Sequence, residues 1–299
     1  GGGFGGKESP LLETLAVLLS EKSGRPVKMV MSRAEVFRAT GPAAPLYAVI
    51  KTGTKKDGTL TACHAKLIVD AGAFPGGPVV RASQLCFGQY KMTNVTVEAY
   101  DVVTNKPRVQ PYRAPGGTST AFAVDSHMDE VAEKLGIDPL QFRLINVAEE
   151  GDQLSDSQFI NRIGMKDILK RISQHPCWTV PLEKGNYRGR GLATGLWPAG
   201  GHLTSSGTVL VHPDGTITLS TGQVDLTGTR TTMRQIVADA MQVPIENVDA
   251  RVGDTDSTSY TDLTAGSRTV YSLGTAVYLA CQDALSQLKD HAADHFQVS

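Results

Sequence analysis

Four loops rich in glycine, serine and threonine are the parts of this chain best suited to hold an anionic ligand. They cover residues 1–9, 113–119, 222–232 and 264–267, and each leads straight into a predicted helix. A helix N-terminus presents unpaired N–H groups and the positive end of the helix dipole, and glycine lets the backbone approach a ligand closely. A single loop of this kind is usually an ordinary cap, but four in one chain predict a ligand held by main-chain contacts.

The first loop, residues 1–8, matches two nucleotide-binding patterns in part. The pattern G-x-G-x-x-G occurs at residues 1–6, but a dinucleotide site also needs a strand directly before it, outside this sequence. The pattern G-x-x-x-x-G-K occurs at residues 1–7, but Glu8 stands where a Walker A loop has the Ser or Thr that binds magnesium. A carboxylate there would repel a triphosphate, so neither pattern is complete.

The second loop places an arginine, Arg113, shortly before Gly116 and Gly117 at the start of a predicted helix. The planar guanidinium of an arginine in such a loop can donate two parallel hydrogen bonds to a carboxylate or phosphate, or one to a carbonyl group. The alternative is an arginine that bridges two surface loops. Taken alone, the residues favour that alternative.

The elements that must position these loops are strands and helices in each half of the chain. Hydrophobic periodicity and turn residues predict helices over 11–19, 118–135, 139–146, 165–174, 231–241 and 268–292, and strands over 27–31, 46–54, 60–69, 95–103, 209–211, 217–219 and 248–252. This pattern predicts an α+β fold with two similarly built mixed α/β lobes. We expect the first lobe over residues 1–150 and the second over 151–299, incomplete at its C-terminus, because an acidic, polar stretch begins at Glu149.

Composition excludes several classes of protein. The 299 residues carry 29 basic and 30 acidic side chains, a net charge of -1, so we expect no nucleic-acid partner and no membrane association. No apolar run is long enough to span a bilayer. The chain opens inside a glycine cluster without an initiating Met, and we therefore expect it to be a piece of a longer protein.

Cysteine and histidine spacing gives no sign of a metal held by side chains. The four cysteines are Cys63, Cys86, Cys177 and Cys281, and they form no C-x-x-C pair. We predict that they are buried free thiols, which is typical of a reducing, cytoplasmic location. The seven histidines lack the spacing of metal-binding motifs. We therefore predict no metal ligated by a protein atom.

A series of motifs, in order along nearly the whole chain, resembles the molybdenum hydroxylases, the family of xanthine dehydrogenases, aldehyde oxidases and their relatives. The glycine loop at 1–8 and the Tyr-Arg-Ala-Pro-Gly-Gly loop at 112–117 are similar to two loops of that family. The stretch 129–146 fits D-E-x-A-x-x-x-G-x-D-P-x-x-x-R-x-x-N, and the motifs at 253–255, 264–267 and 274–277 follow in the family's order.

This resemblance implies a portion of the large catalytic subunit of such an enzyme. In this family the molybdenum is held by the dithiolene sulfurs of molybdopterin, or of its cytosine dinucleotide form, between two lobes and without a protein ligand. Arg113 would orient the substrate and stabilise charge that develops on it, and Phe4 with its flanking glycines would line the active site. The residues implied to bind the cofactor are Gly3, Phe4, Gly5, Gly6, Ala114, Gly222, Thr227, Gly228, Thr229, Ala265, Gly266 and Ser267.

The implied reaction is hydroxylation of a small molecule with water as the oxygen source. The substrate would be an aldehyde, a purine or another N-heteroaromatic compound, and electrons would leave through 2Fe-2S and FAD groups on partner domains or subunits. Glu8 matches the carboxylate that binds the ring in purine-oxidising members, and it equally suits a helix N-terminus. The implied partners also include the remainder of the large subunit and further copies in a homo-oligomer.

Two departures from the family pattern stand out. Leu226-Thr227-Gly228 replaces a Gly-Gln-Gly whose amide touches the cofactor in many relatives, which puts close identity with xanthine dehydrogenase in doubt. The family's catalytic base is a glutamate in a C-terminal segment that this sequence lacks. Removing a proton requires a base within hydrogen-bond reach, so we expect these 299 residues alone to be inactive.

Two alternatives remain open from the sequence. One is a nucleotide-binding domain that uses the glycine loop, which binding of ATP or NAD without molybdopterin would support. The other is a scaffold of the same fold without catalysis, which the altered loop at 226–228 and the missing base would explain. Absence of molybdenum from the intact natural subunit would favour that second alternative.

Overall fold

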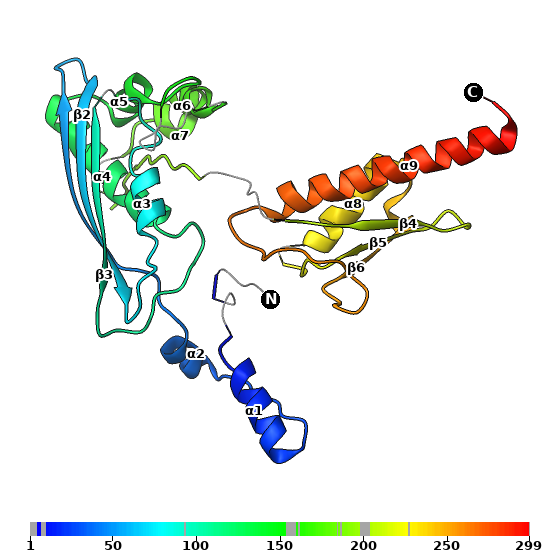
Figure 1. The fold of residues 1–299 in the computed structure, drawn as a ribbon. Coiled ribbons are helices and arrows are strands. Elements are labelled where there is room, and N and C mark those ends of the chain that lie inside the picture. The colour runs from blue at the N-terminus through cyan, green and yellow to red at the C-terminus, as the bar shows by residue number, and fades with distance from the viewer. Residues whose placement is uncertain are drawn as a thin grey trace. The chain divides into compact units, whose positions relative to one another are not determined.

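The computed structural model describes residues 5–6, 10–92, 94–153, 160, 162–183, 185, 187–197, 204–226 and 228–298. The chain divides by its internal contacts into two compact units, and the boundary in the sequence falls between residues 197 and 198 (Figure 1). We call the described residues up to 197 the first lobe and those from 204 onward the second lobe. Each lobe contains one three-stranded sheet and several helices, so the predicted α+β fold with two similarly built lobes is confirmed.

The sheet of the first lobe consists of β1 (Leu46–Thr54), β2 (Leu60–Gly72) and β3 (Val95–Val103), in that order. β1 and β2 form an antiparallel hairpin, whereas β2 and β3 run parallel. The hairpin turn forms at the predicted Asp-Gly pair, where Gly58 has φ +90° and the Lys55 N–H donates to the Thr59 carbonyl at 2.9 Å. Asp-Gly is a strong turn signal because glycine tolerates a positive φ.

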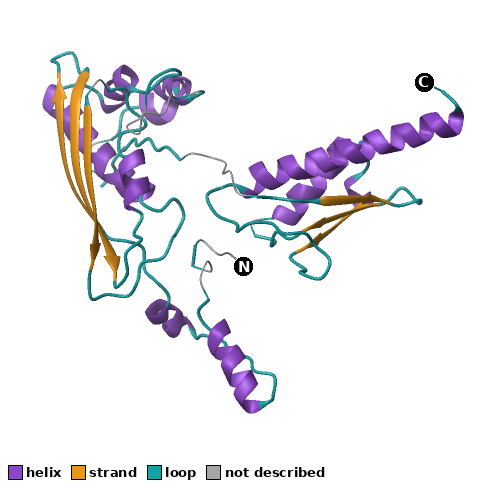
Figure 2. Ribbon diagram, viewed as in Figure 1, coloured by secondary structure: helices purple, strands orange, loops and turns teal. Residues whose placement is uncertain are grey.

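Helices cover one face of this sheet (Figure 2). They are α3 (Val79–Leu85), which crosses from β2 to β3, α4 (Gly117–Leu135) and α5 (Pro139–Asn146). Val124, Met128 and Ala132 of α4 recur every four residues and are fully buried against the sheet. Gly136 ends α4 with φ +69°, and Asp138 caps α5 by accepting two backbone N–H groups, as the sequence predicts for both positions.

Buried polar groups join the helices of the first lobe to a later stretch of chain. The Arg143 guanidinium is fully buried and donates to the buried Asp125 carboxylate from Nε at 3.0 Å and from Nη2 at 2.8 Å. The same carboxylate accepts the Thr194 backbone N–H at 3.2 Å. Residues 187–197 therefore pack with the first lobe, whereas the predicted division falls near residue 150.

Two further helices belong to the first lobe, α6 (Met165–Gln174) and α7 (Pro176–Thr179). Leu169 of α6 is buried against Leu140 of α5, and this small cluster holds both helices on the lobe. The helix predicted over 165–174 is thus confirmed.

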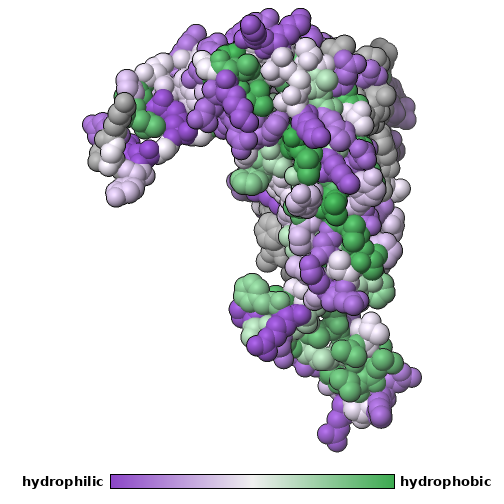
Figure 3. Space-filling model, turned by 90° about the vertical axis from the view of Figure 1, so that its left-hand side faces the viewer, coloured by the Kyte–Doolittle hydropathy of each residue, from purple (hydrophilic) through white to green (hydrophobic). Residues whose placement is uncertain are grey.

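Two N-terminal helices contribute nothing to the core. α1 (Glu13–Ser23) and α2 (Arg33–Ala39) contain no buried residue. Apolar side chains on α1 are exposed, and hydrophobic atoms accordingly gather at the lower end of the molecule in Figure 3. The strand predicted over 27–31 is wrong, because no described strand pairs with it and Val30 is 77% exposed. A lone apolar run cannot form a strand without a neighbour.

The second lobe contains β4 (Thr208–Val211), β5 (Ile217–Thr221) and β6 (Val248–Val252) in that order. β4 and β5 are antiparallel, and β5 and β6 are parallel. The helical elements are α8 (Thr229–Met241), the short turn η1 (Ile245–Asn247), the π-helical turn η2 (Thr269–Leu273) and α9 (Gly274–Phe296). The long helix predicted over 268–292 is therefore η2 followed by α9.

The two lobes repeat one connectivity. In each, a hairpin is followed by a crossover helix, a strand parallel to the second strand, and a long helix that packs on the sheet. Thus β1-β2-α3-β3-α4 corresponds to β4-β5-α8-β6-α9. The core of the second lobe is formed by alternate residues of β5 together with α8 and α9, including Leu219, Val237 and Val277.

Candidate cofactor-binding loops

The predicted site residues are distributed over both lobes. Gly3, Phe4, Glu8 and Thr227 lie outside the described residues. The first lobe holds Gly5, Gly6, Arg113 and Ala114, and the second lobe holds Gly222, Gly228, Thr229, Ala265, Gly266 and Ser267.

In the first lobe the glycine loop touches the arginine loop. Gly5 has φ +86°, and a Cβ atom built on it would lie 2.4 Å from the Pro111 carbonyl oxygen. No side chain fits at that distance, so only glycine permits this contact. Two motifs more than a hundred residues apart in the sequence thus lie against each other, next to Arg113.

The turn that carries Arg113 is held tightly by its backbone. Ala114 adopts φ +55°, which is unusual for a residue with a side chain, and Gly116 adopts φ +78°. A Cβ on Gly116 would lie 2.7 Å from the Pro78 carbonyl oxygen, so the turn is pressed against the start of α3. Arg113 itself is exposed and makes no hydrogen bond or ion pair within the described part of the chain. Its guanidinium can therefore fork onto an anionic or carbonyl oxygen.

The side chain of Tyr112, the residue directly before Arg113, reaches the N-terminus of α4 with its hydroxyl group. Its hydroxyl lies 3.2 Å from Ser119 Oγ, 3.3 Å from Thr118 Oγ1 and 3.4 Å from the Gly116 nitrogen. Burial raises the pKa of the Tyr112 phenol, but its hydrogen bonds with Ser119, Thr118 and Gly116 together outweigh burial, so the pKa is lower than usual.

The ring of Tyr112 also borders a groove of about 550 Å³ between β1 and α4. The other lining residues are Ala43, Ala44, Leu46, Ala48, Thr118, Ser119, Phe122 and Ala123. Alanine, leucine and phenylalanine form most of this wall, and Thr118 and Ser119 are the polar residues beside Tyr112.

In the second lobe two motif loops follow the carboxyl ends of the parallel strands. A Cβ on Gly222, directly after β5, would lie 2.3 Å from the Ser259 carbonyl oxygen, so this loop lies against the chain that follows β6. The next residue, Gln223, is 2% exposed and donates from Nε2 to Thr264 Oγ1. The loops at 222–228 and 264–267 are thereby linked.

The loop at 264–267 has an unusual backbone. Gly266 and Ser267 adopt φ +61° and +59° in succession, and Ser267 carries a side chain in a region that disfavours it by roughly 1 kcal/mol. Arg268 supports the loop from within the lobe, since its guanidinium is buried and donates to the carbonyl oxygens of Asp262 and Leu263 at 2.8 and 2.6 Å. Strained residues of this kind occur preferentially at binding sites.

The start of α8 is only partly open to an anion. Gly228 precedes the helix with φ +83°, and the Thr229 hydroxyl donates to the Leu226 carbonyl oxygen at 2.6 Å. The Asp225 carboxylate already accepts the Arg230 backbone N–H at 3.1 Å. Gly228 gives the backbone room, but Asp225 places a negative charge at this helix end.

Tyr112, Gln223 and Arg268 are contributors to which the sequence assigned no individual role. Tyr112 and Gln223 lie inside predicted motif loops and Arg268 directly follows one, so their places in the sequence were a usable signal. The burial of Gln223 and its bond to Thr264 depend on how the loop folds and could not be predicted.

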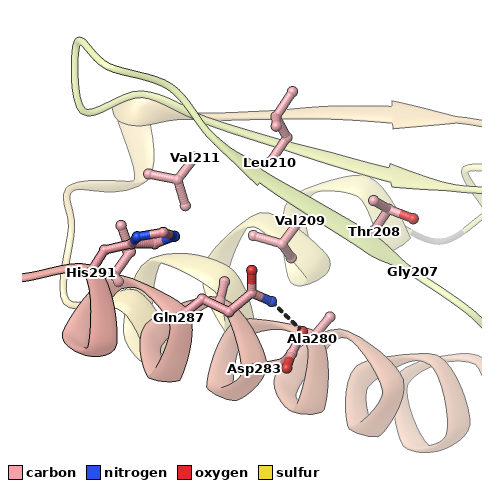
Figure 4. Close-up of a pocket in the computed structure, with 11 residues that line it drawn as sticks. Gly207, Thr208, Val209, Leu210, Val211, Ala280, Asp283, Gln287 and His291 are labelled. Carbon is pink, nitrogen blue, oxygen red and sulfur yellow. Dashed lines mark hydrogen bonds between the residues drawn. The ribbon is translucent and has the colours of Figure 1, made fainter. Parts of the chain in front are cut away.

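A second groove of about 370 Å³ lies between β4 and α9 (Figure 4). Val209 and Val211 of β4 lie across from Gln287 and Asp283 of α9, and Gln287 Nε2 donates to Asp283 at 2.9 Å. None of the predicted site residues lines this groove, so it is separate from the motif loops.

Three of the four cysteines are buried free thiols, as predicted. Burial raises the pKa of the Cys63 and Cys86 thiols to about 12, and the pKa of Cys281 is raised for the same reason. Cys177 is exposed, so the prediction of burial is wrong there: the one-turn helix α7 is too short to cover its own side chains.

Among the described residues no group of three or more His, Cys, Asp or Glu side chains is arranged to hold a metal ion. No described helix is both long and apolar enough to cross a membrane. No described strand lies between the glycine loop and β1.

Each lobe thus has a loop whose backbone is pressed against backbone at a glycine, Gly5 in the first lobe and Gly222 in the second. Models of the molybdopterin cofactor-binding domain match residues 1–147 and 177–299. The chain belongs to the xanthine dehydrogenase and aldehyde oxidase family of molybdenum hydroxylases, which confirms the resemblance seen in its motifs.

Named relatives agree with this assignment. The chain is 30% identical over 305 residues to a probable xanthine dehydrogenase subunit of Bacillus subtilis, a match that covers 98% of this chain and 41% of the relative. It is 34% identical over 188 residues to the nicotinate dehydrogenase large molybdopterin subunit of Eubacterium barkeri, covering 62% of this chain and 44% of that one.

A solved structure shares the fold. The aldehyde oxidoreductase of Desulfovibrio gigas matches with a TM-score of 0.84 and 27% sequence identity, over 95% of this chain and 33% of that one. The chain thus spans about two fifths of the length of the two curated relatives named above.

Proposed function

We propose that this chain forms part of the large catalytic subunit of a molybdenum hydroxylase, and that loops of both lobes bind its molybdopterin cofactor. The observation that carries the proposal is the contact of Gly5 with Pro111, because it joins the glycine loop to the loop of Arg113. Membership of the molybdopterin cofactor-binding domain family supports the same cofactor.

The residues present fit such a cofactor. A pterin with a phosphate group needs close backbone approach and N–H donors, and the backbones of Gly222, Gly266 and Ser267 have the required conformations. Gln223 adds a buried Oε1 without a hydrogen-bond partner in the described chain, which is an acceptor suited to an N–H group. We assign the backbone contacts with the pterin and its phosphate to the loops at 222–228 and 264–267.

The cofactor, when bound, supplies the oxidation of a substrate carbon with water as the oxygen source. Arg113 supplies what the backbone does not, a full positive charge held on a rigid turn. As negative charge builds on the substrate, a fixed cation nearby stabilises the transition state more than the ground state. Arg113 therefore binds the electron-rich end of the substrate and orients it.

The substrate is an aldehyde or an N-heteroaromatic ring such as a purine. The relatives support this range, since they include an aldehyde oxidoreductase, a nicotinate dehydrogenase subunit and a probable xanthine dehydrogenase subunit. The electrons released pass to 2Fe-2S and FAD groups on partner domains or subunits, and the remainder of the large subunit completes the active site. Glu8 is the proposed selector of a purine ring.

The experiment is cofactor analysis of the intact enzyme that contains this chain, with a matched pair of glycine variants. We expect molybdenum and pterin in equal amounts, and Gly5→Ala should lower the molybdenum content because its Cβ would collide with Pro111. Gly189→Ala should not, because nothing lies within 4 Å of a Cβ at Gly189. An intact enzyme without molybdenum would overturn the proposed function.

A further inference from the structure

We propose that the hydroxyl group of Tyr112 is a positioning group for Arg113, which it fixes by holding the turn 113–116 to the N-terminus of α4. The inference rests on the proposed function, because it deepens the role of Arg113 given above. Tyr112 is not itself a group that touches the substrate.

The hydrogen-bonding capacity of the Tyr112 hydroxyl is filled. A phenol has one O–H donor and two acceptor lone pairs. The oxygen accepts the Gly116 N–H at 3.4 Å and the Thr118 hydroxyl at 3.3 Å, so its own proton is directed to Ser119 Oγ at 3.2 Å. All three partners belong to the first turn of α4 or its cap.

The hydroxyl supplies a cap that the cap residue itself cannot provide. Gly116 is the N-cap of α4 and has no side chain to accept an orphan N–H group. The side chain that caps this helix end therefore comes from four residues upstream, across the turn that contains Arg113. Closing the ring from Tyr112 to Gly116 restricts every residue between them.

The chain on both sides of Arg113 is anchored as well. On one side Pro111 lies against Gly5, and Tyr112 forms part of the wall of the groove between β1 and α4. On the other side Gly116 is pressed against the first residues of α3. The hydrogen bonds of the Tyr112 hydroxyl connect these two anchored segments, so they limit the motion of the turn that carries Arg113.

The decisive variant is Tyr112→Phe in the intact enzyme, because it keeps the aromatic ring and removes only the hydroxyl. Misplacing a group that acts in the transition state lowers kcat more than it changes KM. We expect turnover per bound molybdenum to fall about tenfold, with KM changed less than about twofold. Molybdenum content is measured in the same preparations, so that any loss of cofactor through the neighbouring Ala114 is divided out of the turnover.

A matched control is Tyr100→Phe. The Tyr100 hydroxyl also donates a hydrogen bond, to Glu98 at 3.1 Å, but it lies on the outer face of the sheet. Its loss should leave turnover per molybdenum unchanged. A fall equal to that of Tyr112→Phe would mean that loss of any tyrosine hydroxyl weakens the lobe, and the inference would be wrong.

A double-mutant cycle tests whether Tyr112 acts through Arg113. In an Arg113→Ala background the added Tyr112→Phe change should lower turnover less than about twofold, because there is no guanidinium left to position. Equal fold-losses in both backgrounds would overturn the inference. So would unchanged turnover in Tyr112→Phe alone.

A second readout does not depend on activity. Amide hydrogen exchange at Gly116 should accelerate in Tyr112→Phe and stay at the wild-type rate in Tyr100→Phe. Unchanged exchange at Gly116 would show that the hydroxyl does not hold the turn.

Failure of the proposed function has a different signature. In that case Arg113→Ala itself leaves turnover unchanged, or the intact enzyme contains no molybdenum, and the inference about Tyr112 falls with it. If Arg113→Ala lowers turnover and Tyr112→Phe does not, the proposed function stands and only the positioning role is removed.

Discussion

The guanidinium of Arg143 is fully buried against the carboxylate of Asp125, with Nη2 2.8 Å from Oδ1. Removing one partner of a buried pair leaves an uncompensated charge, which costs about 3–5 kcal/mol. We therefore expect Asp125→Ala to lower the free energy of unfolding of the first lobe by that amount, measured by chemical denaturation. Asp167→Ala, which breaks an exposed pair with Lys170, should change it by less than about 0.5 kcal/mol. Equal effects would contradict the buried pair.

Arg113 should matter for turnover and not for cofactor content. Arg113→Ala in the intact enzyme is expected to lower turnover by about 10²–10³-fold, the usual effect of removing a donor aimed at developing charge. Arg113→Lys should recover little of the loss, because an ammonium group cannot fork onto an oxygen pair. The measurement is steady-state turnover divided by molybdenum content. The control is Arg81→Ala, because Arg81 is also exposed and donates a hydrogen bond only to the nearby Gln84 side chain among its described contacts. Unchanged turnover in Arg113→Ala would remove Arg113 from the mechanism.

Ala114 occupies a backbone conformation that suits glycine better. At φ +55° its Cβ is close to the following carbonyl oxygen, so Ala114→Gly should raise the free energy of unfolding by about 0.5–1 kcal/mol. The same change at Ala121, inside α4, should lower it by about 1 kcal/mol, because glycine weakens a helix interior. Thermal unfolding of both variants measures the difference. Destabilisation by both changes would mean that the turn is not left-handed in solution.

Asp70 should make the first lobe sensitive to acid. Its carboxylate accepts Lys106 Nζ at 2.5 Å, Thr104 Oγ1 at 2.6 Å and the Gly72 N–H, and these bonds lower its pKa to about 2. In the unfolded chain the pKa is about 3.9, so the stabilising effect is complete above pH 4 and is lost as pH falls toward 2. Between pH 5 and pH 2 the free energy of unfolding, measured by chemical denaturation, should therefore fall less steeply with pH for Asp70→Asn than for wild type. Parallel curves would show that Asp70 does not contribute to this acid sensitivity.

Cysteine labelling gives a test of burial. At neutral pH an alkylating reagent should modify Cys177 in the folded protein, because it is the exposed free cysteine. Cys63 and Cys86 should resist, because they are buried and their pKa values of about 12 leave almost no thiolate. Peptide mass spectrometry before and after denaturation measures each site. Fast modification of Cys86 in folded protein would contradict the packing of the first lobe.

Local signals in the sequence predicted much of the fold. The Asp57-Gly58 turn, the Asp138-Pro139 helix start and the Gly136 helix end each depend on a few neighbouring residues, and each forms where it was expected. The predicted strand at 27–31 failed because a strand also needs a partner, and nothing in that segment reveals whether a partner exists.

Long-range contacts were beyond the sequence pattern. That Gly5 meets Pro111, or that Thr194 donates to Asp125, depends on how residues far apart in the chain are brought together. The motifs predicted which loops bind a ligand, but they did not indicate which loops touch. The roles that family resemblance implies for the site residues stay predictions, and Gly3, Phe4, Glu8 and Thr227 also lie outside the described residues.

Because the connectivity is repeated, the turn of Arg113 and the loop at 264–267 occupy corresponding places in the two lobes. The turn of Arg113 joins β3 to α4, and the loop at 264–267 joins β6 to η2 and α9, so both are the same joint of one architectural unit used twice. Each copy places left-handed residues there, Ala114 in one and Ser267 in the other. One copy places the exposed Arg113 beside its left-handed residue, whereas the other places the buried Arg268 there.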